Sequence, residues 1–159
     1  MAGYVASQVT KSNKIGYIAS VPIPEVVRGI NAVTLAARAI NPEVTTQVIW
    51  VNSWYDPGKE ADAAKALISN GADIIMQHPA DRAGLQAAEN SGVLALGQAS
   101  DMIKSGRNGQ ITAFRDNWAP YYIERVRAVL DGTWESGDRW SGIAEGEVAM
   151  APYTNLPDD

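Results

Sequence analysis

The stretch Lys14-Ile15-Gly16-Tyr17-Ile18-Ala19, with Pro24 a few residues beyond it, decides the fold class. The six residues form a short apolar run rich in β-formers, which predicts a buried strand. Proline is accepted in the first turn of a helix, and apolar residues then recur at helical spacing from Glu25 to Ile40. A buried strand followed at once by an amphipathic helix is the first half of a strand-helix-strand unit.

The same alternation continues along the chain. Further strands are predicted over 46–51, 72–76, 93–97 and 110–114, and further helices over 59–70, 81–90 and 118–130. Short connections between alternating strands and helices require parallel strands joined by right-handed crossovers. We therefore predict a three-layer, doubly wound α/β fold with a parallel sheet of about five strands. The first residues are predicted to be helical, and 131–159 to form a small hairpin followed by an extended tail.

Composition sets the class of protein. The chain has 159 residues, 46% hydrophobic and 19% charged, which fits one globular domain with a real core. A net charge of -5 makes it a poor candidate for nucleic-acid binding. No apolar run reaches the roughly 18 residues that span a bilayer, and the first residues lack the pattern of a signal peptide. With no cysteine and a single histidine, His78, we expect neither a metal site nor a Ser-His-Asp triad.

Candidate binding residues gather in the loops that follow the predicted strands. In open α/β sheets these loops meet at one edge, where ligands bind near the switch in strand order. The residues are Trp54, Tyr55, Gln77, His78, Gln98, Asp101, Arg115, Asp116, Asn117 and Trp118. The loops at the opposite edge contain plain turn residues. Aromatic rings combined with amides and carboxylates suit a flat ligand with polar edges.

The same residues have structural alternatives. Trp54 and Tyr55 can pack against neighbouring loops, and His78 can order its own loop through a hydrogen bond. Carboxylates and amides close to a helix or turn can act as caps, which applies to Asp56, Asp101, Asp116 and Asn117. Arg28 is predicted to be exposed on its helix.

Phosphate-binding motifs are absent from the sequence. Neither GxxxxGK[ST] nor GxGxxG follows the first strand, and the turn there is Val21-Pro22-Ile23-Pro24, in which two residues have no backbone N–H. A nucleotide pyrophosphate cradle is therefore not expected. A small flavodoxin-like enzyme or receiver that uses His78, Asp101 and Asp116 as acid-base groups remains an alternative.

An ordered set of segments resembles the basic-membrane-protein (BMP) family. The segments are Lys14–Ile18 with Pro22–Ala32, Val51–Glu60, Gly71–Ile75, Gly97–Met102, Asp116–Tyr122 and Met150–Asp159. Family members are substrate-binding proteins of ABC importers, non-catalytic and without cofactors, and many are lipoproteins. The resemblance implies a periplasmic-binding-protein type I (flavodoxin-like) fold, a purine nucleoside or similar solute, an ABC permease as partner, and a location in the periplasm or on the outer face of the cell membrane.

The resemblance covers only the carboxyl-terminal lobe of such two-lobed proteins. It implies a single lobe over residues 1–150 and a tail over 151–159 that would return to the missing lobe. An isolated lobe is expected to bind its solute weakly or not at all, because half of the enclosing surface is missing. The aromatic-rich face that the other lobe would cover is exposed in an isolated lobe, so we expect a homodimer or larger assembly through this lobe-lobe face. A purely structural, self-associating role is a further alternative.

The resemblance also assigns individual residues. Trp54 or Tyr55 stands where the family stacks an aromatic ring on the base, and Asp101 stands where an aspartate holds sugar hydroxyls. The loop His78-Pro79-Ala80 corresponds to a segment that lines the pocket. Nucleoside-binding relatives place a lysine after the fifth strand, where this chain has Asp116, so a nucleobase or another small planar solute fits as well as a nucleoside.

Overall fold

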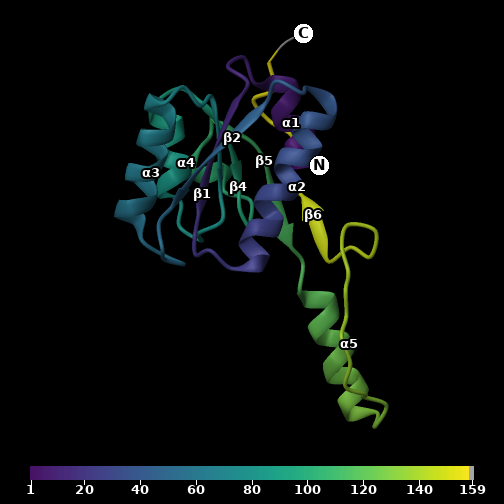
Figure 1. The fold of residues 1–159 in the computed structure, drawn as a ribbon. Helices are drawn as coiled ribbons and strands as arrows, with labels where there is room; N and C mark the ends of the chain where they lie inside the picture. The colour runs from purple at the N-terminus through teal and green to yellow at the C-terminus, as the bar shows by residue number, and fades with distance from the viewer. Residues whose placement is uncertain (158–159) are drawn as a thin grey trace.

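The computed structural model describes residues 1–157, and its elements follow the predicted alternation (Figure 1). The strands are β1 (Lys14–Ala19), β2 (Thr45–Trp50), β3 (Ile74–Gln77), β4 (Leu94–Gly97), β5 (Gln110–Asp116) and β6 (Val148–Met150). The helices are α1 (Ala2–Val9), α2 (Pro24–Ile40), α3 (Pro57–Ser69), α4 (Ala83–Asn90) and α5 (Ala119–Leu130), with a short 3₁₀ turn, η1 (Ile103–Ser105). Residues 158 and 159 of the predicted tail lie outside the described range.

The sheet has the order β2-β1-β3-β4-β5-β6. All pairs from β2 to β5 are parallel, whereas β6 pairs antiparallel with the end of β5. The predicted doubly wound sheet of five parallel strands is therefore confirmed. The structure adds one antiparallel edge strand in the region where a small hairpin was predicted. No helix within residues 1–157 has the length and apolar character needed to cross a bilayer.

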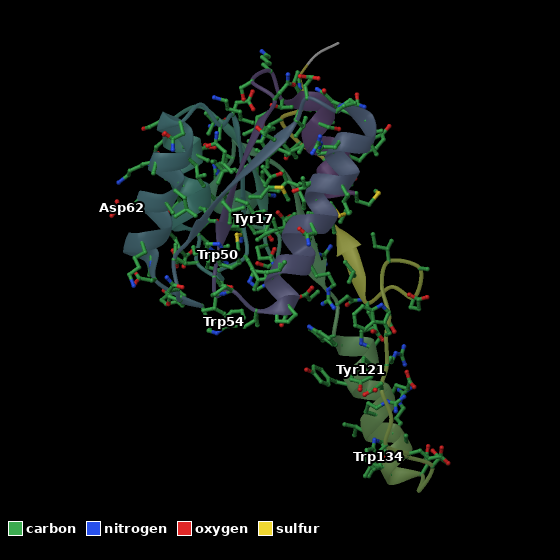
Figure 2. The ribbon with its side chains drawn as sticks, viewed as in Figure 1. Tyr17, Trp50, Trp54, Asp62, Tyr121 and Trp134 are labelled. Atoms are coloured by element: carbon green, nitrogen blue, oxygen red, sulfur yellow. The ribbon has the colours of Figure 1, made fainter. Side chains whose placement is uncertain are left out.

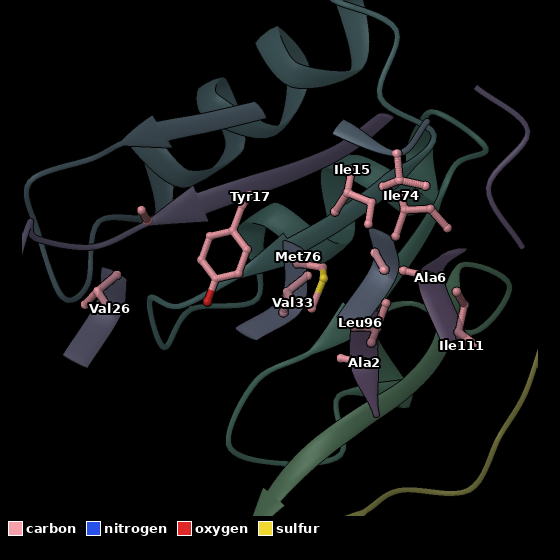
Figure 3. Close-up of a cluster of buried hydrophobic side chains, with 13 residues drawn as sticks. Ala2, Ala6, Ile15, Tyr17, Val26, Val33, Ile74, Met76, Leu96 and Ile111 are labelled. Carbon is pink, nitrogen blue, oxygen red and sulfur yellow. The ribbon is translucent and has the colours of Figure 1, made fainter. Parts of the chain in front are cut away.

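Helices cover both faces of the sheet. One buried cluster joins α1 and α2 to Ile15, Tyr17 and Met76 (Figure 3), and a second joins α3 and α4 to Ile18 and Ile75. Side chains of a strand alternate between faces, so consecutive residues of β1 and β3 enter opposite clusters. Helix α1 packs so closely on α2 that a Cβ atom at Gly3, the second residue of α1, would lie 2.1 Å from the backbone oxygen of Val33 in α2.

Helix α5 does not join either layer. It runs away from the sheet as an arm, and β6 brings the chain back (Figure 1). None of its residues is buried. After β6 the chain remains attached to β5, because the backbone N–H of Ala151 donates to the oxygen of Ala113 at 2.9 Å and that of Thr154 to the oxygen of Ile111 at 2.7 Å.

Asp73 fixes the turn that joins α1 to β1. Its carboxylate accepts hydrogen bonds from the Thr10 hydroxyl (2.6 Å) and from the backbone N–H groups of Lys11 (2.6 Å) and Ser12 (2.8 Å). Burial would raise the pKa of Asp73, but these hydrogen bonds outweigh it and hold the pKa below its usual value of 3.8. The ionised carboxylate therefore stabilises the fold.

Replacing Asp73 with alanine is expected to lower the free energy of unfolding by about 2–3 kcal/mol, because three hydrogen bonds to a charged group are lost. Since the folded-state pKa is depressed, this contribution is present above about pH 4 and is lost as the pH falls through the folded value. Urea denaturation at pH 7 and pH 3 measures both effects. Asp62→Ala, at a side chain 81% exposed, is the matched control. Equal stabilities of the two variants at pH 7 would contradict the role of Asp73.

Candidate functional site

The candidate site lies at the switch in strand order. The chain leaves β1 toward β2 on one side, and β3 pairs with β1 on the other side. Ser20 follows β1 and His78 follows β3, and the Ser20 hydroxyl lies 3.0 Å from His78 Nδ1. The His78 backbone N–H also donates to the oxygen of Ile18 at 2.9 Å. The imidazole is therefore held at the carboxyl edge of the two central strands, where doubly wound sheets bind ligands.

An aromatic ring lies beside this imidazole. The ring centroids of Trp54 and His78 are 5.6 Å apart and their planes are tilted by 54°. The backbone N–H of Ala80 donates to the oxygen of Trp54 at 3.2 Å, which ties the loop after β2 to the loop after β3. Trp54 remains 50% exposed, and Figure 2 shows it at the edge of the lobe. Part of its ring surface is therefore open to a ligand.

A cavity of about 460 Å³ extends inward from His78, between α2 and the sheet. His78 and Gln98 line it from the ends of β3 and β4. Its walls also include Tyr17 from β1, Phe114 from β5 and several small or apolar residues of α1 and α2. A largely apolar cavity with a few converging polar groups is the usual form of a small-molecule site.

His78 carries no charge at neutral pH. Burial lowers its pKa below the usual 6.5, and the nearby Glu25 carboxylate opposes this effect only in part. A neutral imidazole has one N–H donor and one acceptor nitrogen. With Nδ1 facing Ser20, the other ring nitrogen is left for a partner outside this pair.

Asp101 does not line this cavity. Its carboxylate Oδ1 accepts hydrogen bonds from the Ile103 backbone N–H (3.1 Å) and from Gln110 Nε2 (2.8 Å). The structural alternative, in which Asp101 caps a short turn, describes these contacts. The loop is also strained, because Ala99 has a left-handed φ of 59°. Asp101 therefore follows β4 as predicted, but its Oδ1 atom is already hydrogen-bonded to Ile103 and Gln110.

The predicted residues at the end of β5, namely Asp116, Asn117 and Trp118, are not among those that line the cavity behind His78. Asp116 ends β5 and pairs with Val148 of β6, and Asn117 Nδ2 donates to the oxygen of Gly146 at 2.9 Å. Neither caps α5, because its N-cap residue is Trp118 and no side chain makes a cap hydrogen bond. The capping interpretation of Asp116 and Asn117 is therefore wrong.

Trp118 lines a different cleft, also of about 460 Å³. The other walls include Tyr121 on α5 and Arg139 and Trp140 on the returning segment. The guanidinium of Arg28 lies 4.9 Å from the centre of the Trp140 ring and lines both this cleft and the cavity behind His78. The two hollows are therefore neighbours separated by one side chain.

The remaining predicted residues have largely structural surroundings. Pro79 is buried, and its carbonyl accepts a hydrogen bond from Gln77 Nε2 at 3.1 Å, a group that also donates to the Asp81 carbonyl. Tyr55 is 64% exposed. Asp56 caps α3 as predicted, because its carboxylate accepts the Lys59 backbone N–H at 3.1 Å.

Among the polar residues that line the cavity, Tyr17, Glu25 and Arg28 were not predicted site residues. Arg28 is exposed as predicted, but it lies at the mouth of the cavity, one helical turn from Glu25. Tyr17 lies in a strand whose sequence predicts only buried core residues. Only their position in the chain could have indicated Glu25 and Arg28 as site residues, because both follow closely after β1 at the switch point.

The geometry does not assemble an acid-base centre from the residues suggested for an enzyme. Within residues 1–157, no hydrogen bond or ion pair joins His78, Asp101 and Asp116 to one another. In the same range, no three His, Asp or Glu side chains gather in a way that could hold a metal ion. The arrangement can hold a small molecule by stacking and hydrogen bonding.

A doubly wound lobe with a ring-lined cavity at its switch point belongs to the class of α/β small-molecule-binding lobes. Comparison with protein families identifies it further. The chain belongs to the Bmp family, described as ABC transporter substrate-binding protein PnrA-like, which matches residues 1–158. The expected resemblance is confirmed.

The names of two relatives refer to different solutes. The chain is 57% identical over 157 residues to a purine-binding protein of Brucella abortus, covering 99% of this chain and 45% of that protein. It is 40% identical over 146 residues to a candidate ABC transporter glucose-binding protein of Haloferax volcanii, covering 92% of this chain and 37% of that protein. The chain thus spans less than half the length of these curated relatives.

Solved structures agree on the fold. A solute-binding protein of an ABC transporter system from Conexibacter woesei superposes with a TM-score of 0.79 at 23% identity, covering 99% of this chain and 52% of that chain. A transcriptional activator of the comK gene from Bacillus halodurans superposes with a TM-score of 0.83 at 22% identity, covering 99% of this chain and 55% of that chain. These likenesses place the chain in the periplasmic-binding-protein type I fold, of which it forms about half.

The single histidine allows a direct test of the electrostatics of the site. The imidazole of His78 is expected to titrate with a midpoint below 6.5, because burial disfavours its charged form. Proton NMR of the ring resonances across pH 4–8 measures the midpoint. The same chain unfolded in urea is the control and should titrate near 6.5. A folded-state midpoint at or above the unfolded one would contradict the burial of this ring.

Proposed function

We propose that the chain is the carboxyl-terminal solute-binding lobe of an ABC importer's substrate-binding protein, and that its solute is a purine base or nucleoside. The observation that carries this proposal is the adjacency of the Trp54 and His78 rings, 5.6 Å apart, with His78 also lining the cavity at the switch point. The 57% identity to a purine-binding protein supports the choice of solute. An ABC permease as partner and a location in the periplasm or on the outer face of the cell membrane belong to the same proposal.

The chemistry of the site favours a base over a sugar. An indole ring stacks on a base, and neutral His78 and the Gln98 amide offer both donors and acceptors for its edge. Asp101, the residue assigned to sugar hydroxyls by family resemblance, has one carboxylate oxygen bound to Gln110 and Ile103. Because this oxygen is already hydrogen-bonded, Asp101 can accept fewer hydrogen bonds from the hydroxyls of a ribose. No catalytic role is part of the proposal.

Binding by this chain alone is expected to be weak. Trp54 is 50% exposed, so a stacked base would be covered on one face and would meet water on the other. Small-molecule sites reach high affinity by burying most of the ligand surface. A second lobe closing over the first would supply the missing cover.

Replacing Trp54 with alanine is expected to weaken adenine binding about tenfold or more, because stacking on an aromatic side chain contributes about 1–3 kcal/mol per base. Calorimetric titration with adenine, adenosine and guanosine at millimolar concentration measures the effect. Trp134→Ala is the matched control, since this tryptophan is also 50% exposed but lies at the far end of the arm (Figure 2). Equal heats for the two variants would remove Trp54 from the site, and no heat with any purine would contradict the proposed solute.

We further propose that two copies of the chain associate, and we place the contact on α5 instead of the lobe-lobe face expected from the resemblance. One side of this helix carries the apolar residues Tyr122, Ile123, Val126, Val129 and Leu130, which are 51–79% exposed. None of these five residues is buried by other parts of residues 1–157. Pairing α5 of one copy with α5 of the other would cover both faces at once, as twofold interfaces do.

Light scattering coupled to size-exclusion chromatography is expected to give the mass of a dimer at about 100 µM chain, because exposed apolar patches of this kind drive association. Val126→Glu places a charge in the middle of the patch and should shift the species to monomer. Arg127→Gln, on the same helix but outside the apolar set, changes the net charge by the same amount and is the charge-matched control. A monomer of the unaltered chain at high concentration would contradict the α5 interface.

A further inference from the structure

Tyr17 carries a hydroxyl group that faces the cavity behind His78. The residue is only 5% exposed, on the α1/α2 face of β1, and Figure 3 shows its ring standing off the strand with the oxygen at its far end. The hydroxyl makes no hydrogen bond within residues 1–157, and burial alone raises its pKa to about 12. Buried tyrosine hydroxyls usually have a partner. This one opens into the cavity that Tyr17 lines.

The wall opposite this hydroxyl has no side chain. Gly29 of α2 lies there, and a Cβ atom at this position would be 3.4 Å from the Tyr17 oxygen. Val33 and Phe114 make neighbouring walls apolar, whereas Arg28 and Gln98 supply polar groups. A volume of about 460 Å³ falls in the range of small-molecule sites. The cavity therefore combines flat apolar walls with one buried hydrogen-bonding group.

We propose that the polar edge of a solute held beside Trp54 and His78 reaches past His78 into this cavity and hydrogen-bonds to the Tyr17 hydroxyl. The inference rests on the proposed function and extends it by naming the pocket and the group that recognises the edge. The ligand class is a neutral planar ring that carries an amide, amidine or ring-nitrogen edge, a chemistry that nucleobases share. A neutral ring is favoured because Glu25 and Arg28 have opposite charges, so the cavity offers no net charge to an ion.

Two substitutions separate binding from folding. Tyr17→Phe removes only the hydroxyl, and since that group has no partner in the folded chain, the stability should be unchanged or slightly higher. Gly29→Ala places a methyl group against the hydroxyl at ordinary contact distance and should raise the helical stability of α2. Tyr121→Phe, on α5 and outside the cavity, is the matched control for the loss of a phenol group.

Amide NMR spectra of the labelled chain, titrated with adenine and separately with benzamide, test the inference. Both probes should shift the backbone signals of Tyr17 and Gly29. Tyr17→Phe should weaken binding about fivefold or more, as the loss of one hydrogen bond does, and Gly29→Ala should abolish the shifts. Tyr121→Phe should bind as the unaltered chain does.

The outcomes distinguish this inference from the proposed function. Adenine shifts that depend on Trp54 but not on Tyr17 or Gly29 would overturn the inference and leave the proposed function standing. Benzamide shifts at Tyr17 without any adenine binding would support the pocket and overturn the purine assignment. Shifts with neither probe would overturn both.

Discussion

The structure depends on covering both faces of a parallel sheet. Strands β1 and β3 are apolar on both sides, so two helical layers must bury them, and α1/α2 and α3/α4 do so with separate clusters of side chains. The amino edge of the sheet is closed by tight turns such as the one held by Asp73. Only the carboxyl edge, where Ser20, Trp54 and His78 follow their strands, is left for loops with polar and aromatic side chains.

The sequence was sufficient to predict the parallel strands and the helices around them. Apolar runs such as 14–19 and the helical spacing from Glu25 to Ile40 are local signals, and the structure places β1 and α2 at nearly the same bounds. Strand β6 was not predicted as such. It has three residues, and its pairing with Phe114, Arg115 and Asp116 across the whole of α5 is a long-range contact that no local pattern encodes.

The candidate site could be predicted only in part. The position of a loop after a strand correctly indicates the edge of the sheet, which is why Trp54 and His78 meet. It does not indicate the side to which the loop then turns. The loop containing Asp101 folds toward the α3/α4 layer, because Met102 is buried in that cluster. Conversely, Tyr17 was read as core because the alternation of a strand does not reveal a gap opposite one side chain.

The arm formed by α5 has a consequence for how the chain opens. In a single copy of the chain, a helix of 12 residues of which none is buried has marginal stability in water. Arg139 of the returning segment contacts this helix, because it bonds Glu124 at 2.9 Å and lies 5.3 Å from the centre of the Tyr121 ring. The arm is therefore a separate cooperative unit from the sheet. Its backbone amides will exchange with solvent, and proteases will cut it, under conditions in which the sheet remains fully protected.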